Sequence, residues 1–166
     1  MRRDSLLRVG YAVALLLVVG PVLDTITRIW PMRPGDEGWR FGTLGILFNT
    51  MVTPLLGVFL AMVIAAVLEH GRTLRVIAGI TLLAALGSLA AVGLFALDYL
   101  QLRANVTAEA IGGFDVASRK AILMGLLGGL VTIALGITGW QVAGRRAERR
   151  RSAVNVGLVI PQEEKA

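Results

Sequence analysis

Four long apolar runs dominate the pattern of this chain. Between the nearest charged residues they cover positions 9–23, 41–68, 76–97 and 121–144. A helix rises about 1.5 Å per residue, so each of the last three runs is long enough to cross a hydrocarbon core of roughly 30 Å. The pattern therefore predicts a polytopic membrane protein.

The predicted fold is all-α, a four-helix transmembrane bundle over residues 1–151 with a short cytoplasmic tail at 152–166. We expect helices at about 6–27, 42–69, 75–101 and 120–143, with outer loops of about a dozen and roughly 18 residues. Pro21 and Pro54 predict bends in the first two helices. The first run resembles a signal sequence, but it lacks a small-residue cleavage site, so we expect it to be retained.

Composition supports a membrane location and excludes several classes of site. The hydrophobic share is 55% and the mean hydropathy +0.72, which is too apolar for a soluble domain of 166 residues. The chain has no cysteine, which excludes disulfides, thiolate metal sites and cysteine nucleophiles. We expect no metal and no other cofactor.

The net charge of +6 is unevenly distributed along the chain. Lys and Arg are enriched in cytoplasmic segments, so the more basic side is expected to lie inside the cell. With the N-terminus inside, 11 cations are cytoplasmic: Arg2, Arg3, Arg8, Arg72, Arg75, Arg145, Arg146, Arg149, Arg150, Arg151 and Lys165. The outer side then has six, namely Arg28, Arg33, Arg40, Arg103, Arg119 and Lys120. Both termini are therefore expected in the cytoplasm. Arginine strongly outnumbers lysine, and Ala, Gly and Val are abundant, which is typical of a GC-rich bacterial coding sequence. We therefore expect a bacterial inner membrane.

Small residues form stripes on two of the predicted helices. The spacing on the fourth helix places five of them on one face, where they favour close approach of a second helix. The predicted helix-packing residues are Ala84, Gly87, Ala91, Gly125, Gly129, Thr132, Gly136 and Gly139. Whether the partner helix belongs to this chain or to another remains open at this stage.

Polar residues enter the apolar runs from the outer side. A carboxylate inside a membrane helix is expected to face other helices, because exposure to lipid costs up to about 3 kcal/mol at mid-membrane. The candidate polar pocket consists of Asp24, Asn49, Thr53 and Asp98, with Arg28, Arg40 or Arg103 as counter-ions. The alternative is that these are ordinary polar residues at helix ends, with Asp24 and Arg28 forming an i, i+4 pair.

A dense run of arginines follows the fourth helix. Arg145, Arg146, Arg149, Arg150 and Arg151 are candidates for contact with anionic lipid at the inner face. The same residues also serve to fix the topology, and the two roles are compatible. We expect no specific nucleic-acid binding from so short a run.

The chain lacks the residue combinations that catalysis requires. Its single histidine, His70, is on the predicted inner side, whereas the buried carboxylates are on the outer side, so no Ser-His-Asp arrangement is expected. We expect a protein that is not an enzyme. The favoured role is a small integral subunit or assembly factor that packs against other membrane-protein subunits or against itself; the alternative is a small oligomeric transporter or channel with an outer-leaflet polar pocket around Asp98.

Overall fold

The computed structural model describes residues 3–155, and over that range it contains only helices and short connections. The five helices are α1 (Arg3–Ile29), α2 (Glu37–Thr50), α3 (Val52–Val67), α4 (Gly71–Arg103) and α5 (Ile111–Asn155). Three of them, α1, α4 and α5, are long and apolar enough to cross a membrane. The pair α2 and α3 reaches the same standard when taken together, with a bend of 46° between them. The chain is therefore a helical protein with three to four candidate membrane spans.

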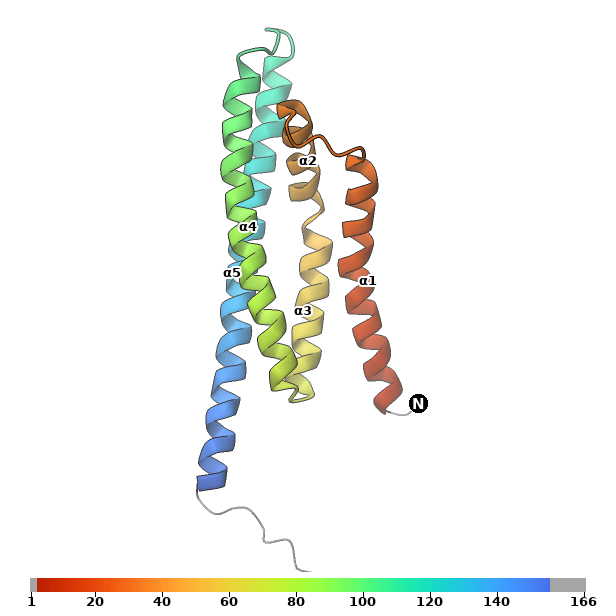
Figure 1. Cartoon of the computed structure of the whole chain (residues 1–166), viewed down its shortest axis with the longest axis vertical. Coiled ribbons are helices and arrows are strands. Elements are labelled where there is room, and N and C mark those ends of the chain that lie inside the picture. Colours follow the sequence, from red (N-terminus) through yellow and green to blue (C-terminus); the bar gives the residue numbers. More distant parts are fainter. Residues whose placement is uncertain (1–2, 156–166) are drawn as a thin grey trace, which may run out of the picture.

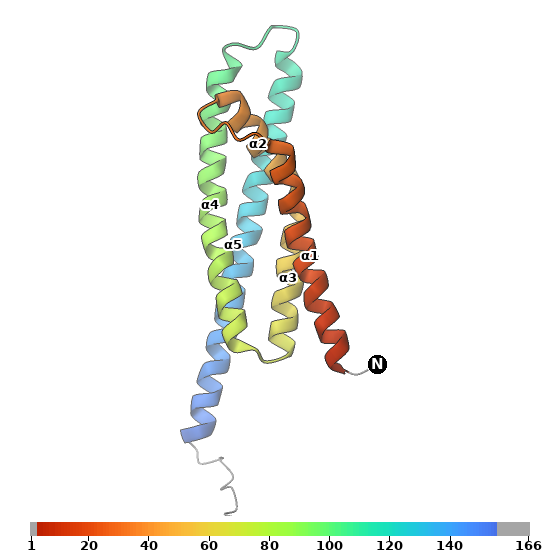
Figure 2. The same ribbon diagram turned by 45° about the vertical axis from the view of Figure 1, so that its right-hand side comes forward.

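The helices run side by side along the long axis of the molecule (Figure 1). The start of α1, the turn between α3 and α4 and the C-terminal end of α5 lie at one end, and the α1–α2 and α4–α5 connections lie at the other. The rotated view in Figure 2 shows the same arrangement. Counted as one broken span, α2 and α3 would bring the candidate crossings from three to four.

Helix α1 lies at the side of the molecule. Its contacts with other helices are confined to α2 and α3, whereas α3, α4 and α5 all contact one another. In a four-helix bundle each helix is expected to have neighbours on two sides. The described part of the chain is instead a core of α2 to α5 with α1 attached along one face of α3 (Figure 2).

The long second helix that the sequence predicts is divided at Met51. Pro54 is the third residue of α3, and it has no backbone N–H to bond to the carbonyl of Thr50. The Thr50 hydroxyl donates to the carbonyls of Ile46 and Leu47, both at 3.1 Å, within the last turn of α2. The bend near Pro54 follows from the sequence, although it separates two helices rather than curving one.

The turn between α3 and α4 is closed by two backbone hydrogen bonds. The amide of His70 donates to the carbonyl of Ala65 at 3.0 Å, and the amide of Glu69 donates to that of Ala66 at 3.3 Å. This is the Schellman pattern, in which the residue after the helix adopts a left-handed conformation. Glu69 occupies that position with φ 57°, although glycine is the residue best suited to it.

Helices α4 and α5 extend further than the apolar runs indicate. The predicted outer loop from Leu102 to Arg119 is wrong in extent, because α4 continues to Arg103 and α5 begins at Ile111. At its other end α5 continues past the predicted limit of 143 to Asn155, so the tail predicted for 152–166 begins as helix. Residues 156–166 of that tail lie outside the described residues.

The core is divided between the two ends of the bundle. One cluster consists of Met62, Ala65, Leu74, Ala78 and Ala143, from α3, α4 and α5. The other consists of Phe48, Val92, Phe95 and Ala121, from α2, α4 and α5. The small residues of the first cluster permit close helix approach near the α3–α4 turn, whereas aromatic rings fill the space near the opposite end.

Candidate functional site

A buried ion pair between α2 and α4 is the most distinctive polar feature of the described residues. Arg40 Nη2 donates to Asp98 Oδ1 at 2.7 Å, and Arg40 Nε donates to Asp98 Oδ2 at 3.2 Å. Both carboxylate oxygens are engaged, in the two-pronged geometry that gives arginine its specificity for carboxylates. The Asp98 side chain is only 5% exposed, so a charge at this position depends on Arg40 for its compensation.

The segment before α2 holds the arginine in place. Asp36 is the N-cap of α2 and accepts a hydrogen bond from the amide of Trp39 at 2.9 Å. The indole Nε1 of Trp39 donates to the carbonyl of Ile29 at 2.9 Å, which ties the start of α2 to the end of α1. Arg40 uses its remaining terminal nitrogen to donate to the carbonyl of Pro34 at 3.1 Å. Arg40 therefore joins the α1–α2 connection to α4.

Aromatic rings pack beside the ion pair and join three helices. Phe41 of α2 stacks on Phe95 of α4 with ring centroids 4.4 Å apart, and on Phe114 of α5 at 5.2 Å. Phe114 also stacks on Tyr99 at 5.6 Å, and Phe48 meets the edge of Phe95 at 5.6 Å. Such pairs are favourable beyond the area that they bury. We call these five rings the aromatic cluster.

A second set of charges joins α4 to α5 at the same end. Tyr99 donates its hydroxyl to Asp115 Oδ1 at 2.8 Å. Arg103 donates through Nε to Asp115 Oδ1 at 2.9 Å and through Nη2 to Oδ2 at 3.0 Å. Asp115 thus accepts from two residues of α4, one turn apart, and fixes the start of α5 against the end of α4.

The four residues of the predicted polar pocket do not bond to one another in the described part of the chain. Among the described residues, no hydrogen bond or ion pair joins any two of Asp24, Asn49, Thr53 and Asp98. Asp24 pairs with Arg28 at 2.8 Å within α1, and both side chains are at least half exposed. Of the three proposed counter-ions, Arg40 is the one that binds Asp98, while Arg103 binds Asp115.

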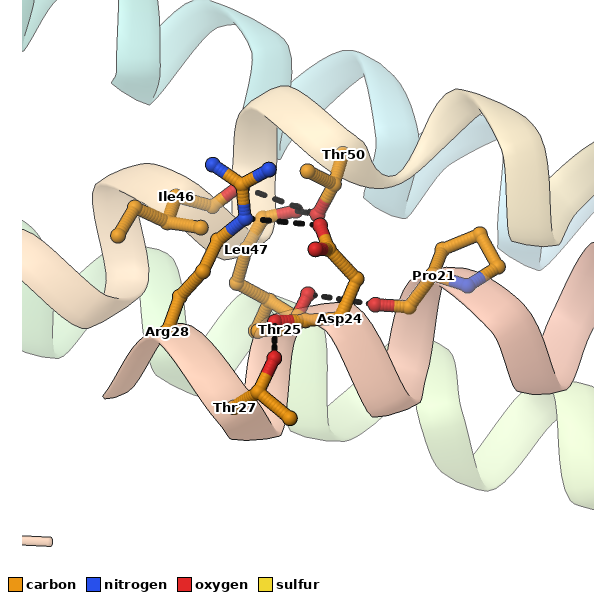
Figure 3. A network of polar contacts seen from close by, with 8 residues as sticks. All are labelled: Pro21, Asp24, Thr25, Thr27, Arg28, Ile46, Leu47 and Thr50. Carbon is orange, nitrogen blue, oxygen red and sulfur yellow. Dashed lines mark hydrogen bonds and ion pairs between the residues drawn. The ribbon is translucent and has the colours of Figure 1, made fainter. Parts of the chain in front are cut away.

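The polar side chains near the C-terminal end of α1 are satisfied locally (Figure 3). Thr25 donates to the carbonyl of Pro21 and Thr27 donates to that of Asp24, both at 2.8 Å. Thr50, drawn with them in Figure 3, bonds only to carbonyls of its own helix. Each interaction in this view stays within one helix, so the group does not form a ligand site across α1 and α2.

The small residues of α5 lie against the other helices of this chain. A Cβ atom at Gly125 would lie 2.7 Å from Val92 of α4, closer than real Cβ atoms approach, and 3.1 Å from Phe48 of α2, which is tighter than most such contacts. Gly136 faces Leu82 in the same way, at 2.7 Å. The remaining predicted positions on this helix continue the face: Gly129 faces Leu89 and Ser88, Gly139 faces Ala78 and Met62, and Thr132 is 4% exposed. The α5 stripe is therefore an internal packing face.

The α4 stripe is only partly internal. Ala91 is half-buried and packs against the cluster around Phe95. Ala84 and Gly87 are exposed, and a Cβ atom at Gly87 would meet nothing within 4 Å. The buried face of α4 runs instead through Ala78, Thr81, Ala85, Ser88, Val92, Phe95 and Asp98. Packing at Ala84 and Gly87 therefore stays a prediction about another helix.

The basic end of the chain has few described contacts. Arg145 is exposed on α5, and Arg146, Arg149, Arg150 and Arg151 continue the same helix, their side chains lying outside the description. At the α3–α4 turn, the Tyr11 hydroxyl lies 3.4 Å from His70 Nδ1. Within residues 3–155 no group of three His, Cys, Asp or Glu side chains is placed to hold a metal ion.

The aromatic cluster and the Asp115 contacts were not predicted from the sequence. A signal for them exists in the spacing, since Phe41 and Phe48 are two helical turns apart on α2, and Phe95 and Tyr99 are one turn apart on α4. Phe114 and Asp115 gave no such signal, because the segment that holds them was expected to be a loop.

No protein-family model, curated protein or solved structure matches the chain. The basis for its function is therefore the placement of its own residues. Those residues form a well-bonded, helix-joining site at one end of the helical core.

Proposed function

We propose that the protein is a small, non-catalytic integral membrane subunit or assembly factor that packs against the helices of a larger complex. The observation that carries the proposal is the Arg40–Asp98 pair. Both oxygens of the buried carboxylate are bound by one guanidinium, which leaves Asp98 to hold α2 against α4 rather than to receive a solute. Among the described residues, every buried side-chain nitrogen and oxygen has a hydrogen-bond partner.

The exterior supports the same role. Helix α1 contacts only α2 and α3, and large apolar side chains are exposed along it, among them Leu15 at 63% and Leu16 at 68%. Lipid or further helices must cover this surface. A chain with such an open side helix is suited to insertion among other membrane helices.

We further propose a bacterial inner-membrane location, with four crossings that form a bundle in which α1 is the peripheral member, and with both termini facing the cytoplasm. The distribution of lysine and arginine supports this orientation, since 11 of the 17 cations then face inward. The arginines from Arg145 to Arg151 then meet the inner leaflet, where anionic lipid is attracted to them.

A small oligomeric transporter or channel is the second candidate. It is favoured by one observation, the burial of Asp98 at the end of the apolar run of α4, because buried ionisable residues of membrane helices often mark the path of an ion or proton. In this role the Arg40–Asp98 contact must open during transport, and the flux depends on the carboxylate.

Purification of the native assembly in mild detergent tests the proposal. A subunit co-migrates with different proteins in a complex of fixed composition, and the liposome-reconstituted chain shows no flux that differs between the native form and Asp98→Asn. Ion or solute flux that is lost in Asp98→Asn but retained in Asp24→Asn, the exposed matched control, would instead support the second candidate.

A further inference from the structure

Two polar side chains lie exposed on the outward face of the broken span. Asn49 is near the end of α2 and Thr53 is near the start of α3, one helical turn further on, and both are exposed. Phe41 begins the apolar run, and a rise of about 1.5 Å per residue puts these two side chains roughly 12 and 18 Å inside it. They therefore lie at the depth of the hydrocarbon core.

Both side chains have unused hydrogen-bonding capacity. Asn49 Nδ2 donates to the carbonyl of Gly45 at 2.8 Å, which uses one of its two N–H groups and leaves the other and the side-chain carbonyl oxygen free. Thr53 makes no side-chain hydrogen bond among the described residues, so its hydroxyl is free to donate and to accept.

The surface around these two residues is apolar. Val52, Leu56, Phe59 and Val63 are exposed by 61%, 55%, 51% and 40%, respectively. Lipid covers such side chains as well as another protein does, so they supply little drive for association in a membrane. Lipid tails cannot satisfy the amide or the hydroxyl, and this is the part of the face that favours a protein partner.

We propose that a second copy of this chain docks on this face, with Asn49 pairing with Asn49 of the other copy. Two copies inserted in the same orientation present identical residues at identical depth. An asparagine side chain has both a donor and an acceptor, so it can pair with itself across a two-fold axis. The Thr53 hydroxyls, one turn deeper, are self-complementary for the same reason.

This inference goes beyond the proposed function, because a dimer of this chain can exist within a larger complex or outside one. The proposed dimer contact uses a side of α3 next to the one that packs against α1. Gly57 and Ile64 meet α1, whereas Asn49, Leu56 and Val63 follow the neighbouring exposed side, and Thr53 lies at the border between the two sides. The dimer contact therefore leaves the internal packing intact.

Cross-linking of single-cysteine variants in native membranes tests the dimer. The chain has no cysteine, so Leu56→Cys and Val63→Cys each introduce one thiol on the proposed face. Oxidation is expected to give a disulfide-linked homodimer, identified by mass, for at least one of them. Leu83→Cys is the matched control, because Leu83 is 70% exposed on α4, away from the face.

The polar pair is tested by adding Asn49→Leu or Thr53→Val to the cross-linking variants. Each lost interhelical hydrogen bond is expected to weaken dimer affinity roughly threefold to tenfold. Because both side chains are exposed in the single chain, the melting temperature of the monomer should not change. Thr53→Val nearly preserves shape, so it tests the hydrogen bond even where Asn49→Leu disturbs α2.

Three results overturn the inference: cross-linking no stronger at Leu56 and Val63 than at Leu83, cross-linking to a different protein in place of a second copy, or dimer affinity unchanged in both polar variants. None of them contradicts the proposed function, which is judged by the composition of the native complex, and cross-linking to a different protein would support it. A complex of fixed composition without a homodimer would leave the subunit role standing.

Discussion

Arg40 and Asp98, 58 positions apart in the sequence, are joined by two parallel hydrogen bonds of 2.7 and 3.2 Å between α2 and α4. The contact unites the connection after α1, through the Arg40 bond to Pro34, with the core formed by α4 and α5. The pair holds a carboxylate that is only 5% exposed, where water compensates poorly for a lost partner. It should therefore determine how α2 is placed.

Removal of either partner of this pair should destabilise the chain. We expect Arg40→Gln and Asp98→Asn each to lower the melting temperature in detergent clearly, because each leaves one charge without compensation. The double variant should lose less stability than the sum of the losses in the two single variants. Arg28→Gln is the control, since it removes the exposed Asp24 pair and should change stability by no more than about 0.5 kcal/mol. Additive effects at Arg40 and Asp98 would show that the pair is not coupled.

A methyl group at Gly125 should separate the helices that meet there. Its Cβ would lie 2.7 Å from the stiff side chain of Val92, so we expect Gly125→Ala to cost about 1–3 kcal/mol in chemical unfolding. Gly87→Ala meets nothing within 4 Å and should stabilise α4 by roughly 1 kcal/mol in the purified chain. Equal effects at the two glycines would contradict the assignment of the α5 face.

The contact between α1 and α3 depends on Gly57. A Cβ atom there would lie 2.8 Å from the backbone carbonyl oxygen of Ala14, which cannot move aside unless α1 moves. We expect Gly57→Ala to reduce cross-linking by a short bismaleimide between cysteines placed at Tyr11 and His70, whose side chains meet in the native fold. Gly20→Ala, which meets nothing within 4 Å, should leave the yield unchanged.

Glu69 is the position at which a substitution should stabilise the fold. It has φ 57° after α3, in the left-handed region that costs an L-residue roughly 1–2 kcal/mol. Glu69→Gly is expected to raise the free energy of unfolding by about 1 kcal/mol, and Glu69→Val to lower it. A loss of stability in Glu69→Gly would mean that the Glu69 carboxylate stabilises the fold by more than the left-handed backbone at this position destabilises it.

The sequence alone predicts where the helices occur, but it does not predict which side chains of the site bond to one another. Long apolar runs between charges predict where spans occur, because the bilayer imposes the length, and Pro54 predicts the break next to Met51. The ends of α4 and α5 were missed because charged residues mark the end of the apolar run and not the end of a helix. Arg103 and Asp115 lie beyond the runs and still belong to helices.

The residues of the predicted polar pocket do not bond to one another in the described part of the chain, for a geometric reason. Depth along the membrane normal can be counted from the sequence, and Asp24, Asn49 and Asp98 were grouped by depth. The direction in which each helix faces depends on packing, which in this fold turns Asp98 inward and leaves Asp24 and Asn49 exposed. The pairing of Asp98 with Arg40, and not with Arg28 or Arg103, could not be predicted for the same reason, because it depends on α2 lying beside α4.

Two-sided labelling of single-cysteine variants tests the central claim, four crossings with α2 and α3 as one broken span. A membrane-impermeant maleimide should label cysteines at Ser5, Arg72 and Ser152 from the cytoplasmic side only, and cysteines at Gly35 and Thr107 from the opposite side only. Labelling of Ser5 and Ser152 from opposite sides would mean an odd number of crossings and would contradict the account.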